Sequence, residues 1–247
     1  MTITEQTTVL ITGANKGLGR ETARRLGAQG WTVFLGARDD ARGQAAAAEL
    51  AADGVKVVPV SLDVTSDESV AAAVRLVRDH TDRLDVLINN AGAPGTAVPP
   101  ANATAEDVHS VYDTNVYGPI RVTHAFLPLL QVADNPRVVM VSSAGGSFAV
   151  VTDPGQPVSK MHELAYSSSK AALNMLTLRY AQALPNIKFN AATPGEVVNH
   201  TFAATDMNNH MGRLTVTEGT DSIIRLATLG SDGPTGTFTD RLGLIAW

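Results

Sequence analysis

Residues 9–19 read Val9-Leu10-Ile11-Thr12-Gly13-Ala14-Asn15-Lys16-Gly17-Leu18-Gly19. The first three form a short apolar, largely β-branched run that predicts a buried strand. The segment from Arg20 to Gln29 has a helical pattern that Gly30 closes. A glycine-rich turn between a strand and a helix lets backbone amides approach a phosphate at the positive helix end. The turn therefore predicts a nucleotide-phosphate site, with an ordinary glycine turn as the alternative.

A second predicted strand, residues 32–37, ends just before Arg38. In a dinucleotide-binding fold this strand end faces the adenosine ribose, where an acidic residue would favour the free 2′-hydroxyl of NAD. Here the position is followed by Arg38, and Lys16 lies in the glycine turn, so the two cations favour the 2′-phosphate of NADP(H). The alternative for Arg38 is a solvated surface charge without a ligand. Asp39 and Asp40 are expected to cap the helix that follows.

The alternation of strand and helix continues through the chain. Strands are expected at 55–62, 85–88, 137–141, 187–192 and 236–239, and helices at 41–52, 66–80, 104–130 and 217–229. The 104–130 helix is long or kinked. Repeated units at this spacing predict an α/β fold, a Rossmann-type doubly wound parallel sheet flanked by helices. With no linker or repeat in the sequence, residues 1–247 are expected to form a single domain.

Tyr166 and Lys170 lie four residues apart in a further predicted helix. That spacing puts the phenol and the ammonium on one helix face, one turn apart. Free tyrosine has a pKa of about 10, and a neighbouring positive charge lowers it. The pair is a chemically sensible general acid/base, although an ordinary surface helix can carry the same spacing.

Composition limits the classes of protein that the chain can represent. A hydrophobic content of 44% and a charged content of 17% predict a folded protein with a sizeable core. The net charge of −5 argues against a nucleic-acid or membrane-surface binder. Because cysteine is absent and the histidines are scattered, we expect no metal site and no disulfides. The polar N-terminus and the lack of a long apolar run predict a soluble, cytoplasmic protein.

A set of motifs occurs along the chain in a fixed order. They are Thr12-Gly13-x-x-x-Gly17-x-Gly19, Asn89-Asn90-Ala91-Gly92, Asn115, Ser142-Ser143, Tyr166-x-x-x-Lys170 and Pro194-Gly195. In this order they resemble the short-chain dehydrogenase/reductase family, in its single-domain TGxxxGxG/YxxxK form, over nearly the whole chain. Residues 114–118 and the tail ending in Trp247 are most similar to NADPH-dependent carbonyl reductases.

The resemblance implies a role for each matching residue. Tyr166 would be the catalytic acid/base, and Lys170 would lower its pKa and hold the nicotinamide ribose. Ser143 would hydrogen-bond the substrate carbonyl, and Asn115 would hold a water on a proton relay. Together with the cations above, the expected NADP(H)-binding residues are Gly13, Asn15, Lys16, Gly17, Leu18, Gly19, Arg38, Asp63, Val64, Asn90, Ala91, Gly92, Tyr166, Lys170, Pro194 and Gly195.

Asp63 and the asparagines at the end of the 85–88 strand each have a second interpretation. The Asp63 carboxylate could accept a hydrogen bond from the adenine amino group, or it could simply begin the turn before the next helix. The asparagine side chains at positions 89 and 90 could tie adjacent strands together or line the cofactor crevice.

The sequence departs from the family pattern between Ser143 and Tyr166, where the interval is longer than the most common spacing. Residues 145–164 are expected to form an irregular loop before the catalytic helix. Four apolar residues of this loop could line a substrate pocket: Phe148, Val150, Val151 and Met161. The loop could also alter the surface through which many family members assemble, so a monomer and a homo-oligomer both remain open.

A second departure follows Pro194-Gly195. Residues 196–214 are expected to form a mobile lid over the substrate, with Phe202, Met207 and Met211 as apolar contacts, or else a surface loop that packs only locally. The family often has a threonine here that contacts the nicotinamide carboxamide. In this sequence that role could fall to Asn199, Thr201 or Thr205.

These features predict an NADPH-dependent oxidoreductase that reduces a ketone or aldehyde to an alcohol, reversibly, and so acts as a carbonyl reductase or alcohol dehydrogenase. Its expected partner is a small, apolar carbonyl or alcohol compound. The alternative is a catalytically silent NADP(H)-binding regulatory protein on the same scaffold. A sugar-nucleotide epimerase is disfavoured, because the chain lacks G-x-x-G-x-x-G spacing and a distinct substrate-binding portion.

Overall fold

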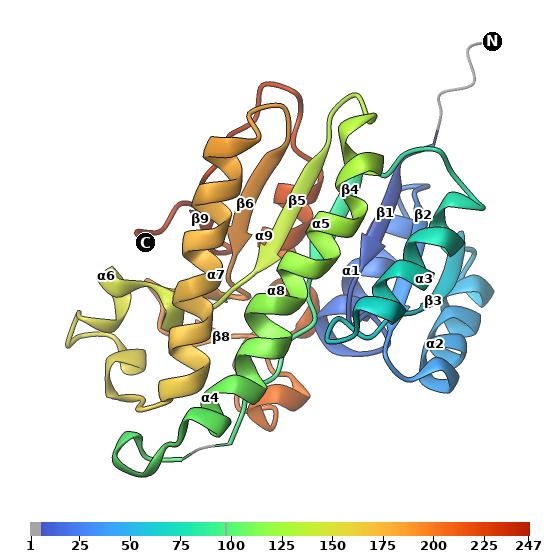
Figure 1. Ribbon diagram of the computed structural model, residues 1–247. Coiled ribbons are helices and arrows are strands. Elements are labelled where there is room, and N and C mark those ends of the chain that lie inside the picture. The colour runs from blue at the N-terminus through green and yellow to red at the C-terminus, as the bar shows by residue number, and fades with distance from the viewer. Residues whose placement is uncertain (1–5, 97) are drawn as a thin grey trace.

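Seven parallel strands form one central sheet in the order β3-β2-β1-β4-β5-β6-β9 (Figure 1). The computed structural model describes residues 6–96 and 98–247, so residues 1–5 and 97 of the predicted domain lie outside it. The strands are Thr8–Ile11 (β1), Thr32–Ala37 (β2), Val57–Ser61 (β3), Val86–Asn89 (β4), Arg137–Val141 (β5), Lys188–Ala192 (β6) and Phe238–Thr239 (β9). The predicted doubly wound parallel sheet is confirmed.

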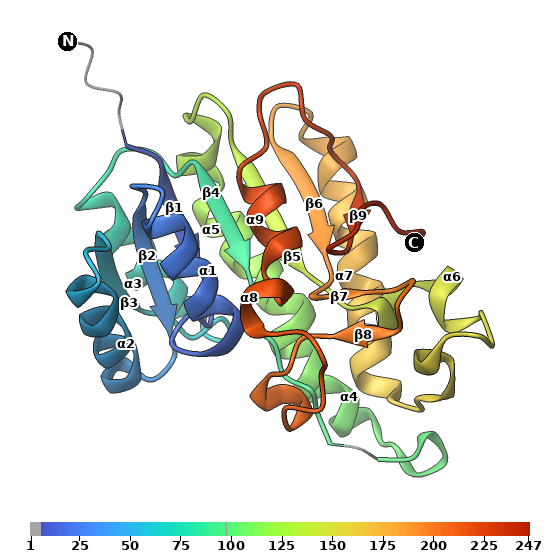
Figure 2. The same ribbon diagram turned by 180° about the vertical axis from the view of Figure 1, so that it is seen from behind.

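Helices cover both faces of this sheet, because successive strand side chains point to opposite faces. Val9 and Ile11 belong to one buried cluster and Leu10 to the other, and β4 and β5 alternate in the same way. The first cluster packs against α1 (Gly17–Gly27), α2 (Asp40–Ala52) and α9 (Asp221–Ala227), of which α1 and α9 lie in front in Figure 2. The second packs against α3 (Asp67–Arg78), α5 (Gly118–Gln131) and α7 (Leu164–Ala183) (Figure 1).

The strand order reverses between β1 and β4, which are neighbours in the sheet but not in the sequence. In open parallel sheets, ligands bind beyond the carboxyl ends of the strands at such a reversal. The loops after β1, β2, β3, β4, β5 and β6 all leave this edge, at the lower end of the sheet in Figure 1. Six connections therefore converge where a ligand is expected.

The long helix predicted at 104–130 is kinked rather than continuous. It consists of α4 (Ala105–Tyr112), a π-helical turn at Asp113–Tyr117, and α5. A π-turn accommodates an extra residue within a helix and often occurs at functional sites. The turn contains Asn115, one of the predicted site residues.

The single helix predicted at 217–229 is wrong. The structure has two short helices, α8 (Val216–Gly219) and α9, separated at Thr220. The Thr220 hydroxyl donates to the carbonyl of Thr217 and accepts from Arg25 of α1, and the side chain is fully buried. Arg25 also donates to the carbonyl of Thr217 (2.9 Å), so this long-range contact takes up hydrogen-bonding groups at the point where the helix breaks.

The two loops that depart from the family pattern carry more structure than expected. Residues 145–164 contain a 3-10 turn at Ala144–Gly146, the short helix α6 (Phe148–Val151) and a second 3-10 turn at Pro157–Lys160. Residues 196–214 contain most of a small antiparallel hairpin of β7 (Gly195–Glu196) and β8 (Thr201–Phe202). The prediction of an irregular loop before the catalytic helix is therefore wrong in part.

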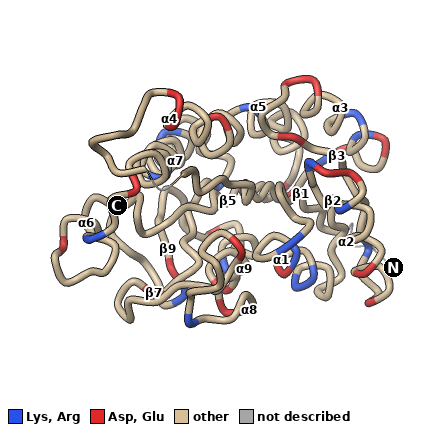
Figure 3. The backbone as a smooth tube through the Cα atoms, turned by 90° about the horizontal axis from the view of Figure 1, so that it is seen from below, with Lys and Arg blue, Asp and Glu red and all other residues tan. Residues whose placement is uncertain are grey.

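Charged residues of both signs are interspersed around the rim of the molecule when it is seen from below (Figure 3). In the part of the chain that the structure describes, the helices are all too short or too polar to cross a bilayer.

Candidate active site

A cavity of about 730 Å³ opens at the carboxyl ends of the strands. Its walls are formed by the residues that directly follow β1, β2, β3, β4, β5 and β6, together with the loops before α7 and after β6. All sixteen residues of the predicted cofactor-binding set line this cavity, as does Ser143. The structure thus brings the predicted site together from segments far apart in the sequence, except for Asn115, which does not line the cavity.

The glycine turn at one end of the cavity requires glycine at three positions. Gly13 and Gly17 have positive φ angles of 62° and 53°, which other residues adopt only with strain. Gly19 has an ordinary φ, but a Cβ atom there would lie 2.6 Å from the carbonyl oxygen of Gly13. The helix α1 begins at Gly17, and within the described chain no side chain caps it. Its first amide groups are therefore available to a phosphate.

Side chains from the neighbouring strand end hold the glycine turn in place. The Thr12 hydroxyl accepts from the amides of Asn90 (3.0 Å) and Ala91 (2.9 Å). The Asn90 amide nitrogen donates to the carbonyls of Thr12 (2.8 Å) and Gly13 (3.1 Å). Asn90 thus ties the ends of β1 and β4 together and also lines the cavity. It therefore fills both of the roles that the sequence left open for it. Sequence reasoning assigned no role to Thr12, although a threonine at a buried strand end is a visible signal.

Two cations and two carboxylates line this part of the cavity. Arg38 lines it directly after β2 and has no ion-pair partner among the described residues. The Lys16 ammonium pairs with Asp206 of the opposite loop at 2.7 Å, a contact that the sequence did not predict. Asp63 accepts from the backbone amide of Thr65 (3.0 Å), so it begins a turn and lines the cavity as well. Asp39 caps α2 through the amide of Arg42, as expected.

The Ser143, Tyr166 and Lys170 side chains meet on the other side of the cavity. The Lys170 ammonium is buried, donates to the carbonyl of Val141 (2.9 Å) and lies 5.6 Å from the centre of the Tyr166 ring. Burial lowers the pKa of Lys170 to about 8. Burial raises the pKa of Tyr166 to about 12, hydrogen bonding with Ser143 opposes the shift, and the Glu163 charge adds to it. The expected lowering of the tyrosine pKa is therefore not seen, because desolvation of the phenolate dominates.

The turn that carries Ser143 is docked onto α7 by an asparagine that sequence reasoning missed. The Asn174 side chain accepts from the Ser142 hydroxyl (2.6 Å) and donates to the carbonyl of Gly146 (3.0 Å). A Cβ atom on Gly146 would lie 2.5 Å from the Lys170 carbonyl carbon, so the turn and the helix are in close contact. Asn174 lies one turn after Lys170 on the same helix face, and that spacing was a signal available in the sequence.

Asn115 occupies a supporting position instead of lining the cavity. Its side chain is fully buried, accepts from the amide of Ala93 (2.7 Å) and donates to the carbonyl of Ala93 (2.9 Å) and the Ser169 hydroxyl (3.0 Å). It therefore connects the chain after β4 to α7 through the π-turn. Its expected role in holding a water stays a prediction.

The apolar residues predicted to line a substrate pocket divide into two groups. Met161, Phe202 and Met207 line the cavity. Phe148, Val150, Val151 and Met211 do not: Phe148 and Met211 are each 71% exposed, and Val150 is buried within the short helix α6. The prediction is wrong for these four. For three of them the reason is local, because residues 148–151 form α6, which Ser147 caps and ties to the carbonyl of Ala246.

A glycine turn at an uncapped helix start, in one cavity with Ser143, Tyr166 and the buried Lys170 ammonium, is the arrangement expected of an oxidoreductase of the dinucleotide-binding class. The family model for short chain dehydrogenases matches residues 7–211. Short-chain dehydrogenase/reductase 1 of Saponaria officinalis is 35% identical over an alignment that covers 94% of this chain and 93% of the relative. The (+)-neomenthol dehydrogenase of Arabidopsis thaliana is 32% identical, with 94% and 95% covered.

A solved structure agrees with these relatives. The NADPH-bound carbonyl reductase from chicken fatty liver superposes with a TM-score of 0.84 at 30% identity, covering 98% of this chain and 99% of that one. The chain belongs to the short-chain dehydrogenase/reductase family of oxidoreductases. The family and the fold class expected from the ordered motifs are confirmed.

Proposed function

We propose that the protein is an NADPH-dependent reductase of ketones or aldehydes that can also run in reverse as an alcohol dehydrogenase. The observation that carries the proposal is the meeting of Ser143, Tyr166 and Lys170 in the same cavity as the uncapped start of α1. The chicken relative that superposes on the chain is a carbonyl reductase bound to NADPH, and this supports the same assignment.

The residues present supply what carbonyl reduction demands of a protein. NADPH, when bound, supplies the hydride that the substrate carbonyl carbon accepts. Ser143 and Tyr166 donate hydrogen bonds to the carbonyl oxygen as negative charge develops on it, and such preorganised donors are often the largest catalytic contribution. Tyr166 then transfers its proton to that oxygen, and the buried Lys170 ammonium stabilises the phenolate left behind.

The assay that tests this function measures NADPH consumption by the purified protein against aromatic, aliphatic, cyclic and quinone carbonyl compounds. Turnover of at least one class is expected. A protein that binds NADPH but oxidises none of it across the panel would instead be the silent NADP(H)-binding protein considered as the alternative.

The preference for NADP(H) rests on Arg38, whose guanidinium has no ion-pair partner among the described residues and lines the same cavity as Lys16. Charge-assisted, bidentate contacts suit a 2′-phosphate. Arg38→Asp is expected to weaken NADPH binding by about ten- to a hundredfold relative to NADH, because an attractive contact becomes repulsive. Dissociation constants for both cofactors, measured by fluorescence titration, check this.

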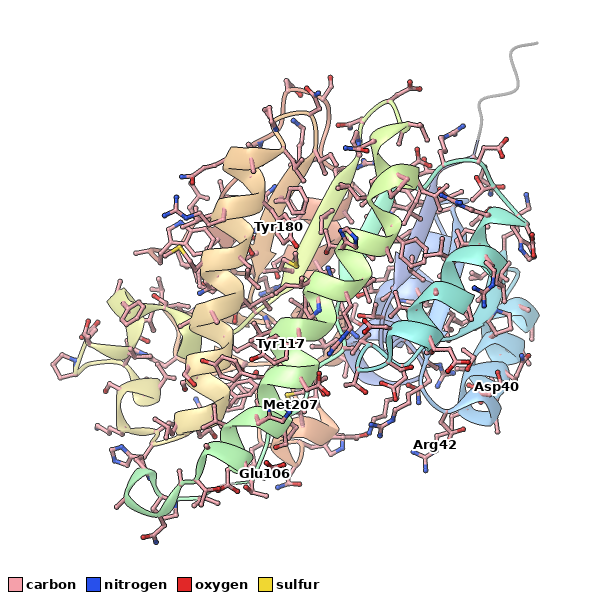
Figure 4. The ribbon with its side chains drawn as sticks, viewed as in Figure 1. Asp40, Arg42, Glu106, Tyr117, Tyr180 and Met207 are labelled. Atoms are coloured by element: carbon pink, nitrogen blue, oxygen red, sulfur yellow. The ribbon has the colours of Figure 1, made fainter. Side chains whose placement is uncertain are left out.

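The matched control for that substitution is Arg42→Asp. Arg42 is exposed on α2, four residues further on and outside the cavity lining (Figure 4). This control should leave the ratio of the two affinities nearly unchanged. An equal ratio in Arg38→Asp and in the unmodified protein would refute the 2′-phosphate assignment.

Thr201 is the residue that we propose for contact with the nicotinamide carboxamide. Among the residues that the structure describes, its hydroxyl is buried and has no hydrogen-bond partner, although the residue lines the cavity. Asn199 is bonded to Glu196 instead, and Thr205 begins the turn at Asp206–Asn208, where its backbone amide donates to the Asn208 side chain (3.0 Å). We expect Thr201→Val to weaken NADPH binding by about fivefold while Thr201→Ser retains it. Calorimetric titration measures both, and equal affinities in the two variants would exclude the contact.

A further inference from the structure

The substrate end of the cavity has apolar walls. Met161, Phe202 and Met207 line it with 45%, 38% and 42% of their surfaces exposed, although large hydrophobic side chains are usually covered in a folded protein. Two of these come from the loop after β6 and one from the loop before α7 (Figure 1). An apolar substrate body would cover them.

Most charged side chains in the same cavity already have partners. Asp206 pairs with Lys16 at 2.7 Å, and Glu196 pairs with Arg241 at 2.5 Å. The Lys170 ammonium donates to a backbone carbonyl. His200 lies at the tip of the β7–β8 hairpin, where its ring contacts the Gln156 side chain at 3.1 Å.

Glu163 differs from the other acidic residues of the cavity. Within residues 6–96 and 98–247 its carboxylate makes no ion pair and no side-chain hydrogen bond, not even the cap that its position before α7 would permit. It lies three residues before Tyr166, and its charge contributes to the raised pKa of that tyrosine. A negative charge therefore acts on the reacting end of the cavity from a carboxylate that has no ion-pair partner among the described residues. The N-terminus of α7 favours a carboxylate there, but that interaction leaves both oxygens free to bind a ligand.

We propose that Glu163 selects carbonyl substrates that carry a positive charge, such as a protonated or quaternary amine, on an apolar body. The inference rests on the proposed reductase function and names the class of substrate within it. The cation would pair with the Glu163 carboxylate while the apolar part covers Met161, Phe202 and Met207. Because the carboxylate is exposed at the cavity wall, the pairing has the modest strength of a solvent-accessible ion pair.

Two ketones of the same shape separate charge from size: para-(trimethylammonio)acetophenone and para-tert-butylacetophenone. The ammonium group also activates the carbonyl electronically, so the informative quantity is the ratio of the two kcat/KM values, compared between variants. Glu163→Gln is expected to lower the cation-to-neutral ratio by about fivefold, and Glu163→Asp should retain most of it. Glu106→Gln, the same change on α4 outside the cavity lining (Figure 4), should leave the ratio unaltered.

Calorimetric titration of both ketones into the NADP⁺ complex, which cannot reduce them, repeats the comparison without turnover. A ratio that is the same in Glu163→Gln and the unmodified protein, or failure of both ketones to bind, overturns the role of Glu163. If the binding ratio responds to Glu163 but no carbonyl compound in the wider panel is reduced, the reductase function fails and the recognition of a cation stands. Thermal unfolding and NADPH affinity show that each variant is folded.

Discussion

Tyr166→Phe is expected to lower kcat for carbonyl reduction by about 10²- to 10⁴-fold while leaving the dissociation constant of NADPH within about threefold. The substitution removes one hydroxyl from a half-buried ring and keeps the ring itself. Burial raises the pKa of that hydroxyl to about 12, so it stays protonated and ready to donate at neutral pH. Without it, Ser143 alone can donate to the developing oxyanion and no side chain delivers the proton. Stopped-flow measurement of single-turnover NADPH oxidation separates this chemical step from product release.

Tyr180→Phe is the matched control for that experiment. Tyr180 is also on α7, is partly buried, and stacks on Phe189 with ring centres 5.0 Å apart, well away from the cavity lining (Figure 4). Loss of its hydroxyl should leave kcat nearly unchanged. Comparable turnover in Tyr166→Phe and Tyr180→Phe would mean that Tyr166 is not the proton donor.

The sequence predicted the sheet from local patterns, and it predicted the members of the cavity from strand ends together with the resemblance to the family. A short apolar run fixes a buried strand, and a residue that follows such a strand must lie at the carboxyl edge with the others. Arg38, Asp63, Asn90 and Ser143 reach one cavity for this reason alone. No contact between distant side chains was needed to infer it.

The features that the sequence did not predict depend on contacts between side chains far apart in the chain. The break at Thr220 follows from its hydrogen bond with Arg25, nearly two hundred residues away. The Lys16–Asp206 pair likewise joins the glycine turn to the loop after β6. The pKa of Tyr166 was misjudged because the nearby ammonium was visible in the sequence, whereas the burial that outweighs it was not. Charge patterns can be read along a chain, but desolvation depends on the folded surroundings.

Gly19→Ala is expected to weaken NADPH binding strongly, because the glycine turn approaches residue 19 too closely for a side chain. The new Cβ atom would lie 2.6 Å from the Gly13 oxygen, 2.9 Å from the Ala14 Cα and 2.5 Å from the Asn90 side-chain nitrogen. Two of these neighbours are backbone atoms of the turn itself, so the turn must move away from the start of α1. Overpacking of this kind costs about 1–3 kcal/mol. We expect NADPH affinity to fall by at least about tenfold, because the phosphate cradle and the site of the clash coincide.

Gly30→Ala is the control that distinguishes a general loss of folding stability from damage to the phosphate-binding turn. Gly30 follows the opposite end of α1 with a φ of 86°, and a Cβ atom there would meet nothing within 4 Å. The left-handed backbone makes this alanine cost about 1–2 kcal/mol of folding free energy without touching the cavity. Urea unfolding should therefore show both variants destabilised, while calorimetric titration shows weakened NADPH binding only in Gly19→Ala. Equal NADPH affinity in the two variants would mean that the close approach at Gly19 serves helix packing and not the cofactor.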